Sequence, residues 1–372
     1  MPPRLILFGA FDRHNFGDLL LAHCAAAAHL GREVLFAGLA ERDLRPWGGH
    51  AVRPLAELIG LYGGDPTELV HVGGEVLTTS AWEAAVMLQT PAEARRVIGR
   101  FERDAAGGRA WAAQFLGTRR ALPYVVGAGD LPAGWTVRFV AVGGVAFEAL
   151  AVDVRDEALH ALRGAASVSV RDRRTRAALQ EGGVSSVLVP DPAANVRGLF
   201  ADVVAARRGG PAFAELRQSG APWLAVQLAA SWGDDASLAR IARAVADAAR
   251  KRRAEIVLFC AGLAPWHDDA GVLQRLASKL ARVAPEIEVR VFPSADVFDL
   301  CALLAYADGY LGTSLHGWIV ARSFGVPALC LVENGDAKAA VYVQTWADAV
   351  GGALTTLDGL PARCAALVEH GA

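Results

Sequence analysis

The sequence has few cysteines, and their arrangement suits neither a disulfide framework nor a zinc site. There are five in 372 residues, an odd number, and no two of them form a C-x-x-C pair. Zinc fingers and disulfide-rich secreted domains both depend on paired, regularly spaced cysteines. We therefore expect free thiols in a reducing compartment, and we predict no metal site.

An excess of one charge and a long apolar run are also missing. Lysine and arginine together number 37 against 39 aspartates and glutamates, which leaves a formal charge of −2. Such a balance gives no overall attraction to nucleic acid or anionic lipid, so neither is predicted as a partner. No apolar run reaches the ~18 residues of a membrane span. The short apolar start is followed by Asp12 and Arg13, where a signal peptide would continue. We expect a cytoplasmic protein without a membrane span.

Apolar residues, by contrast, are abundant. They make up 53% of the 372 residues, enough for two cores of ~150 to 200 residues each. Runs typical of strands alternate with Ala-, Leu- and Arg-rich runs typical of helices, which predicts an α/β fold with parallel sheets. A Gly/Pro-interrupted stretch at 207–211 separates two such series. We predict two Rossmann-like, doubly wound domains, residues 1–205 and 206–372, that face an interdomain cleft.

The expected elements place the loops in which a site would form. In the first half, the expected strands are 5–9, 69–72, 123–126, 138–142, 167–170 and 187–189, with a helix at 18–30. In the second half, strands 223–228, 255–260, 287–292, 309–311 and 327–332 alternate with helices 236–252, 268–283, 296–306, 316–324 and 337–349. Open α/β sheets bind ligands beyond the carboxyl ends of their strands, so the site should come from loops that follow strands.

The first of these loops, residues 9–18, leads directly into a helix. Gly17 lets the backbone approach a ligand closely, and the N–H groups at a helix start suit an anion or a sugar hydroxyl. Asn15 and Asp18 add polar side chains, and Asp18 is either a plain helix cap or a functional carboxylate. The loop is not a G-x-G-x-x-G motif, which argues against a dinucleotide.

Two further strand ends carry charged side chains. Arg171 follows the expected strand 167–170, and its planar guanidinium suits a phosphate or a carboxylate. The alternative is a surface ion pair that opens a helix. Asp191 lies between two prolines, which stiffen the chain on both sides of its carboxylate. It is either a positioned carboxylate or part of a simple turn.

The segment 310–321 is the most informative one. A strand leads through Thr313 and Ser314 into a helix start, and His316 lies in the first turn, where Gly317 leaves open space beside it. The helix dipole disfavours a cationic imidazole there, whereas a phosphate bound nearby favours it. His316 would then donate a proton only when substrate is present. The alternative is a histidine with a purely structural role.

The rarity of lysine draws attention to one residue. The chain has only Lys251, Lys279 and Lys338, so its ordinary cation is arginine. Lys338 follows the expected strand 327–332, one βα unit after His316. If the two strands concerned are neighbours, they lie ~4.8 Å apart and their loops reach one pocket. Lys338 would then bind phosphate as a compact charge, unless it is an ordinary surface lysine.

Taken in order, several motifs resemble the polysaccharide pyruvyl transferase family. They are Asn15-Phe16-Gly17-Asp18, Val72-Gly73-Gly74, Ser169-Val170-Arg171-Asp172-Arg173, Pro190-Asp191-Pro192, Gly312-Thr313-Ser314-Leu315-His316-Gly317 and Phe324-Gly325-Val326-Pro327. The resemblance implies a glycosyltransferase-B-like pair of Rossmann-type domains. It also implies transfer of a pyruvyl group from phosphoenolpyruvate, the donor substrate, to a saccharide, with formation of a ketal, release of phosphate and no further cofactor. The acceptor is a saccharide that a lipid or a nucleotide can carry, and a homo-oligomer is compatible with the sequence.

The same resemblance suggests roles for individual residues. It makes His316 the general acid and lets Arg171 and Lys338 hold the donor, with the acceptor on the N-terminal domain and the donor on the C-terminal domain. Asp18 and Asp191 are the candidate bases. The other predicted substrate-binding residues are Asn15, Gly17, Thr313, Ser314 and Gly317. Two alternatives are a nucleotide-sugar-dependent glycosyltransferase or epimerase of the same architecture and a non-catalytic glycan-binding homologue.

Overall fold

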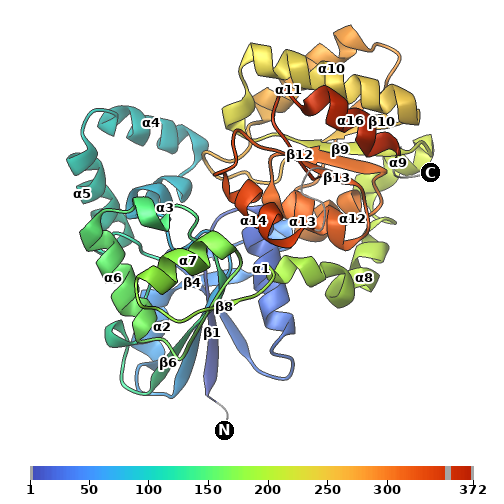
Figure 1. Cartoon of the computed structure of the whole chain (residues 1–372). Coiled ribbons are helices and arrows are strands. Elements are labelled where there is room, and N and C mark those ends of the chain that lie inside the picture. Colours follow the sequence, from blue (N-terminus) through green and yellow to red (C-terminus); the bar gives the residue numbers. More distant parts are fainter. Residues whose placement is uncertain (1–2, 348–352, 370–372) are drawn as a thin grey trace. The chain divides into compact units, whose positions relative to one another are not determined.

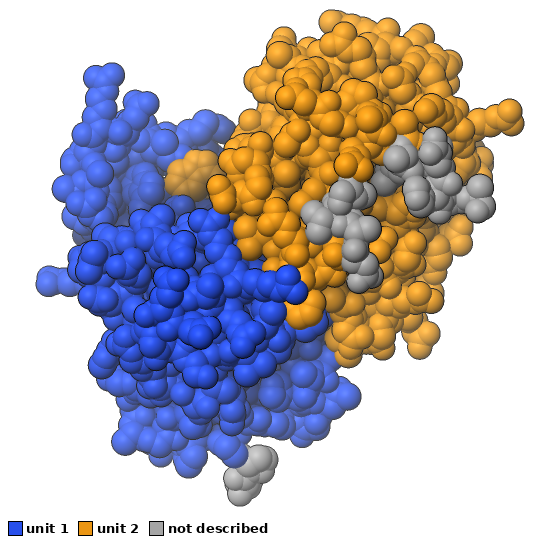
Figure 2. All heavy atoms as spheres, in the orientation of Figure 1, with its two compact units in different colours: residues 1–192 blue, residues 193–372 orange. Residues whose placement is uncertain are grey.

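A computed structural model describes residues 3–347 and 353–369 (Figure 1). The chain divides into two compact units, Met1–Pro192 and Ala193–Ala372 (Figure 2). Each unit contains one mainly parallel β-sheet covered by helices. The prediction of two Rossmann-like α/β domains is thus confirmed, while a cleft shared by the two domains stays a prediction. Over the described residues, no helix combines the length and the apolar character that a bilayer crossing needs.

The sheet of unit 1 has eight strands in the order β3-β4-β2-β1-β5-β6-β7-β8. They are β1 (Arg4–Phe8), β2 (Val34–Gly38), β3 (Arg42–Asp43), β4 (Ala51–Pro54), β5 (Thr67–Val72), β6 (Trp135–Val142), β7 (Ser167–Val170) and β8 (Val187–Leu188). Every neighbouring pair is parallel except β3 and β4. The central strand β1 is almost wholly apolar and buried because helices cover both faces of a parallel sheet.

Most helices of unit 1 follow an N-cap residue whose side chain accepts a backbone hydrogen bond. The helices are α1 (Phe16–Ala27), α2 (Leu55–Tyr62), α3 (Ala81–Met87), α4 (Pro91–Phe101), α5 (Ala105–Leu116), α6 (Val152–Arg163) and α7 (Arg173–Glu181), of which α2 and α6 have no such side-chain cap. Ser80 and Thr90 form capping boxes with glutamates three residues later, which fixes the starts of α3 and α4. Helices α3, α4 and α5 form an insertion between β5 and β6 and lie beside one another in Figure 1.

The predicted strand 123–126 is wrong, because this segment is a buried loop. Tyr124 and Val125 are buried in the core as a strand would be, so their apolar character gave a misleading signal. The backbone N–H of Val126 donates to Nε2 of His71 (3.2 Å) instead of to a neighbouring strand. Strands β2, β3 and β4 were not predicted, since they are short and largely half-buried or exposed.

The sheet of unit 2 is wholly parallel, in the order β11-β10-β9-β12-β13-β14. Its strands are β9 (Trp223–Gln227), β10 (Glu255–Leu258), β11 (Val289–Val291), β12 (Gly309–Gly312), β13 (Ala328–Leu331) and β14 (Leu354–Thr355). Its helices are α8 (Val196–Arg207), α9 (Ala214–Ser219), α10 (Asp235–Arg252), α11 (Ala270–Val283), α12 (Val297–Ala305), α13 (Leu315–Ser323), α14 (Lys338–Trp346) and α16 (Leu360–Glu369). The predicted alternation is confirmed, although residues 348 and 349 of the predicted helix 337–349 lie outside the described residues.

The division between the units falls after Pro192, earlier than the boundary predicted after residue 205. Helix α8 belongs to unit 2 because its apolar side chains pack there. Phe200 meets Phe298 of α12 edge to face, with ring centroids 5.3 Å apart, and Val204 is buried. Arg207 also forms salt bridges with Asp296 and Asp299 at the start of α12. The Gly/Pro-rich stretch after Arg207 is therefore a loop inside unit 2.

Candidate functional site

The loop between β1 and α1 is held by Asn15, which is the N-cap of the helix. Its side-chain oxygen accepts hydrogen bonds from the backbone N–H groups of Gly17 (3.0 Å) and Asp18 (3.4 Å). Asp18 therefore does not cap α1. Its side chain is 13% exposed, and its carboxylate lies 3.9 Å from Arg13. A Cβ atom placed on Gly74 would be 3.1 Å from the same carboxylate, so Asp18 faces the loop after β5.

A buried polar network of Asp12, Arg13 and Tyr124 supports this loop, and none of these residues was predicted as part of the site. Asp12 accepts hydrogen bonds from the backbone N–H groups of Leu39 and Ala40 and, at 3.2 Å, from the hydroxyl of Tyr124. Arg13 donates to that hydroxyl at 2.6 Å. Burial raises the pKa of Asp12, while the charge of Arg13 and these hydrogen bonds lower it. Consecutive charged residues directly after a buried strand were the available signal.

Arg171 and Asp191, predicted independently, form a buried ion pair. Arg171 donates to Asp191 at 3.0 Å and to Glu75 at 2.7 Å, and its side chain is only 3% exposed. The alternatives of a surface ion pair and a simple turn are therefore wrong. Burial alone would lower the pKa of Arg171, but the charges of Glu75 and Asp191 raise it above its usual value. The cluster ties together the chain just after β5, β7 and β8.

Glu75 is the most exposed member of this cluster and was not among the predicted site residues. Its side chain is 22% exposed, whereas that of Asp191 is fully buried. A Cβ atom at Gly143 would lie 2.5 Å from Glu75 and 2.8 Å from Nε of Arg171. The glycine therefore leaves room for the ion pair. Glu75 and Asp18 are two partly accessible carboxylates at the carboxyl edge of this sheet.

In unit 2, Gln227 at the end of β9 holds the joint between β12 and α13. Its side-chain oxygen accepts hydrogen bonds from the backbone N–H groups of Thr313 (3.1 Å) and Ser314 (2.8 Å). Its amide nitrogen donates to Asp268 at 2.8 Å. The backbone N–H groups of Thr313 and Ser314, two predicted substrate-binding residues, are thus already used inside the unit. The side chain of Ser314 accepts from the N–H of Gly317 (3.2 Å) and caps α13.

Asp268 is a half-buried carboxylate that anchors this joint through Gln227. Burial raises its pKa to about 6, although hydrogen bonds from Gln227 and from the backbone N–H of Ala261 lower it. Asp268 anchors Gln227, whereas the next residue, Asp269, is the N-cap of α11.

The prediction that Gly317 leaves open space beside His316 is wrong. A Cβ atom at Gly317 would lie 2.5 Å from the hydroxyl oxygen of Tyr310 and 2.7 Å from its Cζ. Tyr310 belongs to β12, is fully buried, and donates from its hydroxyl to the carbonyl of Ser314 (3.1 Å). The glycine is therefore needed so that this ring can pack against the first turn of α13.

His316 and Lys338 begin neighbouring βα units. His316 is half-buried in the first turn of α13, after β12, and Lys338 is the exposed first residue of α14, after β13. β12 and β13 are neighbouring parallel strands, which was the condition for His316 and Lys338 to lie close together. Lys338 thus lies in a helix start rather than in a loop, and it makes no salt bridge with any residue that the structure describes. An acid–base group and a cation share this edge of the sheet with two helix N-termini, which favours an anion.

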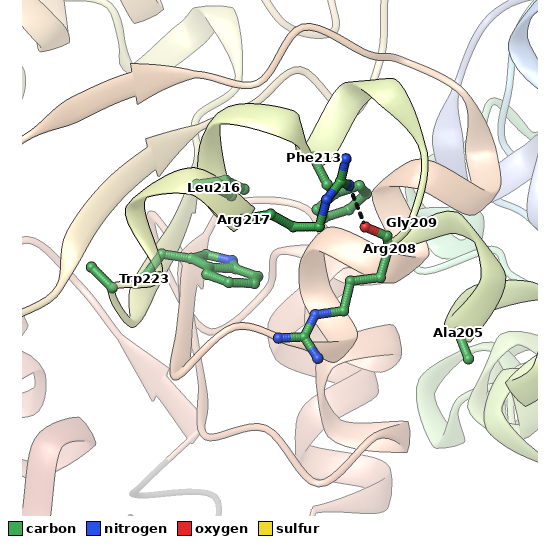
Figure 3. Close-up of a pocket in the computed structure, with 9 residues that line it drawn as sticks. Ala205, Arg208, Gly209, Phe213, Leu216, Arg217 and Trp223 are labelled. Carbon is green, nitrogen blue, oxygen red and sulfur yellow. Dashed lines mark hydrogen bonds between the residues drawn. The ribbon is translucent and has the colours of Figure 1, made fainter.

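A separate hollow of about 510 Å³ lies at the amino end of β9 (Figure 3). It contains no predicted site residue. Its two arginines, Arg208 and Arg217, are engaged locally: Arg217 donates to the carbonyls of Arg208 and Gly210, both at 2.7 Å, and the guanidinium of Arg208 lies 4.6 Å from the ring centroid of Tyr306. Because ligands of such sheets bind at the carboxyl ends of strands, this hollow is not the predicted site.

Comparison with known protein families confirms the resemblance predicted from the sequence. The family model described as polysaccharide pyruvyl transferase matches residues 153–335. This range includes Arg171, Asp191 and His316, whereas Asp18 and Lys338 lie outside it. The family is one of transferases. No curated protein matches the sequence.

Solved structures with a similar fold include two UDP-GlcNAc 2-epimerases and a protein in complex with UDP and glucose. UDP-GlcNAc 2-epimerase from Methanocaldococcus jannaschii has a TM-score of 0.56 and 11% identity, covering 100% of this chain and 92% of its own. The Neisseria meningitidis UDP-GlcNAc 2-epimerase bound to UDP-GlcNAc has a TM-score of 0.55 and 9% identity, with coverage of 99% and 92%. Anabaena HepE in complex with UDP and glucose has a TM-score of 0.50 and 12% identity, with coverage of 99% and 90%. These likenesses support the glycosyltransferase-B-like fold.

Proposed function

Because residues 153–335 resemble the polysaccharide pyruvyl transferases, we propose that this chain transfers a pyruvyl group from phosphoenolpyruvate to a saccharide, forming a ketal and releasing phosphate. The observation that carries the proposal is the pair of helix starts in unit 2. His316 and Lys338 follow the paired strands β12 and β13, so an acid and a cation lie at one edge of the sheet. We place this reaction in the cytoplasm, with an acceptor carried by a lipid or a nucleotide.

The chemistry of the donor explains why these groups are needed. His316 donates a proton to the methylene carbon of phosphoenolpyruvate, which leaves an oxocarbenium ion at C2. Lys338 binds the phosphate as a point charge. A sugar hydroxyl attacks C2 and loses its proton to a base, and the bond between C2 and the phosphate oxygen then breaks. A second hydroxyl of the same sugar attacks the new cation and loses its proton, which closes the ketal.

On the acceptor side, the surroundings of the carboxylates favour Asp18 over Asp191 as the base. Asp191 is fully buried and engaged by Arg171, so a sugar hydroxyl cannot reach it without breaking the ion pair. Asp18 is partly exposed beside the loop after β5. Arg171 is itself balanced by two carboxylates, so we assign it the positioning of the strand ends and leave donor binding to unit 2.

The acid role of His316 is tested by phosphate release. Purified protein is incubated with phosphoenolpyruvate and a panel of lipid- or nucleotide-linked sugars, and phosphate and the mass of the sugar are followed. His316→Gln is expected to lower turnover by at least ~100-fold, the usual worth of a general acid, with donor binding unchanged. His160→Gln, an exposed histidine of α6, is the control. Near wild-type turnover in His316→Gln would rule out the acid role.

The donor-binding role of Lys338 has its own readout. Lys338→Gln is expected to raise the KM for phosphoenolpyruvate roughly tenfold, because a charge-assisted contact is lost. Lys251→Gln is a matched control, since Lys251 is exposed on α10. An unchanged KM in Lys338→Gln would reject this assignment.

A second candidate function is favoured by the structural neighbours that hold UDP-GlcNAc or UDP and glucose. On this reading the chain acts on a nucleotide sugar as a glycosyltransferase or an epimerase. The same panel separates the two functions, because a nucleotide sugar would be consumed or epimerised without phosphoenolpyruvate. Glycan binding with no turnover of either donor would instead indicate a non-catalytic homologue.

A further inference from the structure

The helical insertion of unit 1 encloses a large hollow with apolar walls. Its volume is about 690 Å³, within the range of roughly 300 to 1,000 Å³ that small-molecule sites occupy. Trp82 of α3 and Ile98 and Phe101 of α4 line it. Leu122, Leu150 and Val154 contribute from the segments before β6 and around the start of α6. Since these walls come from separate elements, the hollow is a feature of the tertiary fold.

Small residues of α5 keep the hollow open. Gly108 and Ala113 line it, and a Cβ atom at Gly108 would lie 3.2 Å from the ring of Trp82. The ring of Trp82 is also held edge to face by Trp111, with centroids 5.7 Å apart, and by Phe101 at 6.0 Å. The aromatic wall is therefore fixed, and the space beside it is not filled by side chains of the described residues.

Positive charge is concentrated at this hollow. Arg109, Arg119 and Arg120 line it, against one acidic residue, Glu102. Arg120 is paired with carboxylates outside the lining. Arg109 and Arg119 are exposed, and neither makes a salt bridge within the described parts of the chain. The hollow thus combines apolar walls with two arginines available to an anion.

The hollow is also lined in part by loops that leave the carboxyl edge of the sheet of unit 1. Ser80 belongs to the loop that follows β5 and its Gly73-Gly74 motif, and Leu150 belongs to the loop that follows β6. These loops leave the carboxyl ends of adjacent strands. Nearly all of the lining lies before residue 153, where the match to the family model begins.

We propose that this hollow binds the apolar part of an amphipathic anion, whose phosphate or carboxylate is held by Arg109 and Arg119. The ligand is a single molecule with an alkyl or aryl body rather than a bilayer, because the apolar surface is concave and small. Burial of its apolar body contributes favourable binding free energy. Its charged end pairs with the arginines, so it should bind more tightly than a neutral amphiphile. The site does not depend on the pyruvyl transfer proposed above, because binding here needs no donor.

Calorimetry with octyl phosphate tests the proposal on the full chain without phosphoenolpyruvate. Octyl phosphate is expected to bind at least tenfold more tightly than octyl glucoside or inorganic phosphate. Ala113→Leu fills the hollow and should weaken binding of octyl phosphate at least tenfold. Ala110→Leu, on an exposed position of the same helix outside the lining, is the matched control and should bind as the wild type does. Arg109→Gln with Arg119→Gln should bring octyl phosphate down to the affinity of octyl glucoside.

Several outcomes would overturn the proposal. Equal affinity in Ala113→Leu and wild type would place the ligand elsewhere, provided that circular dichroism shows both to be folded. If Ala113→Leu fails to fold, Ala151→Leu, at a lining position outside α5, replaces it under the same criteria. Equal binding of octyl phosphate and octyl glucoside would remove the role of the arginines. Binding to phosphatidylglycerol vesicles without binding to monomeric octyl phosphate would indicate a membrane surface and refute a single-molecule site.

Discussion

Asp268 shows how one side chain can make stability depend on pH. Burial raises its pKa to about 6, above the ~3.9 of an unfolded aspartate. The native state therefore holds this proton more tightly, so the free energy of unfolding should fall as pH rises from about 4 to about 6. At ~1.4 kcal/mol per unit, the loss is about 3 kcal/mol. Urea unfolding at a series of pH values measures this slope, and Asp268→Asn should lack it.

The neighbouring carboxylate provides the comparison for this test. Asp269 caps α11 and lies on the same turn as Asp268. Asp269→Asn keeps a capping oxygen and leaves the carboxyl group of Asp268 in place, so its slope should equal that of the wild type. A slope that survives in Asp268→Asn would assign the pH dependence to another group.

At the scale of elements, Arg171 joins the ends of three strands of unit 1. Arg171→Met would leave the carboxylates of Asp191 and Glu75 without their cation, which is expected to cost about 3 to 5 kcal/mol of unfolding free energy. Denaturant unfolding at neutral pH measures this loss. Adding Asp191→Asn to Arg171→Met should recover part of it, because the buried charge is then removed.

A surface arginine on the following helix separates this effect from a general loss of charge. Arg176 is exposed on α7, and Arg176→Met should change the free energy of unfolding by about 0.5 kcal/mol or less. A similarly small loss in Arg171→Met would show that the ion pair contributes little to holding the strand ends.

The same scale shows what a sequence can and cannot predict. The alternation of unit 2 was predictable because buried parallel strands appear as short apolar runs, and the placement of His316 and Lys338 followed from that order. Glu75, one of the two carboxylates that bind Arg171, is 96 residues from it in the sequence. Tyr124 is 112 residues from Asp12. Contacts at such separations leave no local pattern, so the buried networks could not be foreseen.

At the scale of the whole molecule, the place of α8 decides where the chain can be divided. A fragment of residues 193–372 keeps Phe200 against Phe298, whereas a fragment of residues 206–372 loses this contact together with the buried Val196 and Val204. Losing large buried side chains costs several kcal/mol. The longer fragment should therefore melt cooperatively and at a higher temperature, as thermal unfolding by circular dichroism would measure. Equal melting temperatures would favour the boundary at residue 205.

The hydrogen bonds from Thr313 and Ser314 to Gln227 affect how ligand binding at the carboxyl edge of the unit 2 sheet can change during evolution. Because the main-chain amides of Thr313 and Ser314 are satisfied from within, any anion bound at this edge would depend on side chains such as His316 and Lys338 rather than on those two peptide groups. Main-chain donors are common to every sequence that adopts a fold, whereas side chains can be exchanged by single mutations. Relatives with the same fold can therefore change which anion they bind by single side-chain substitutions, while the sheet stays unchanged.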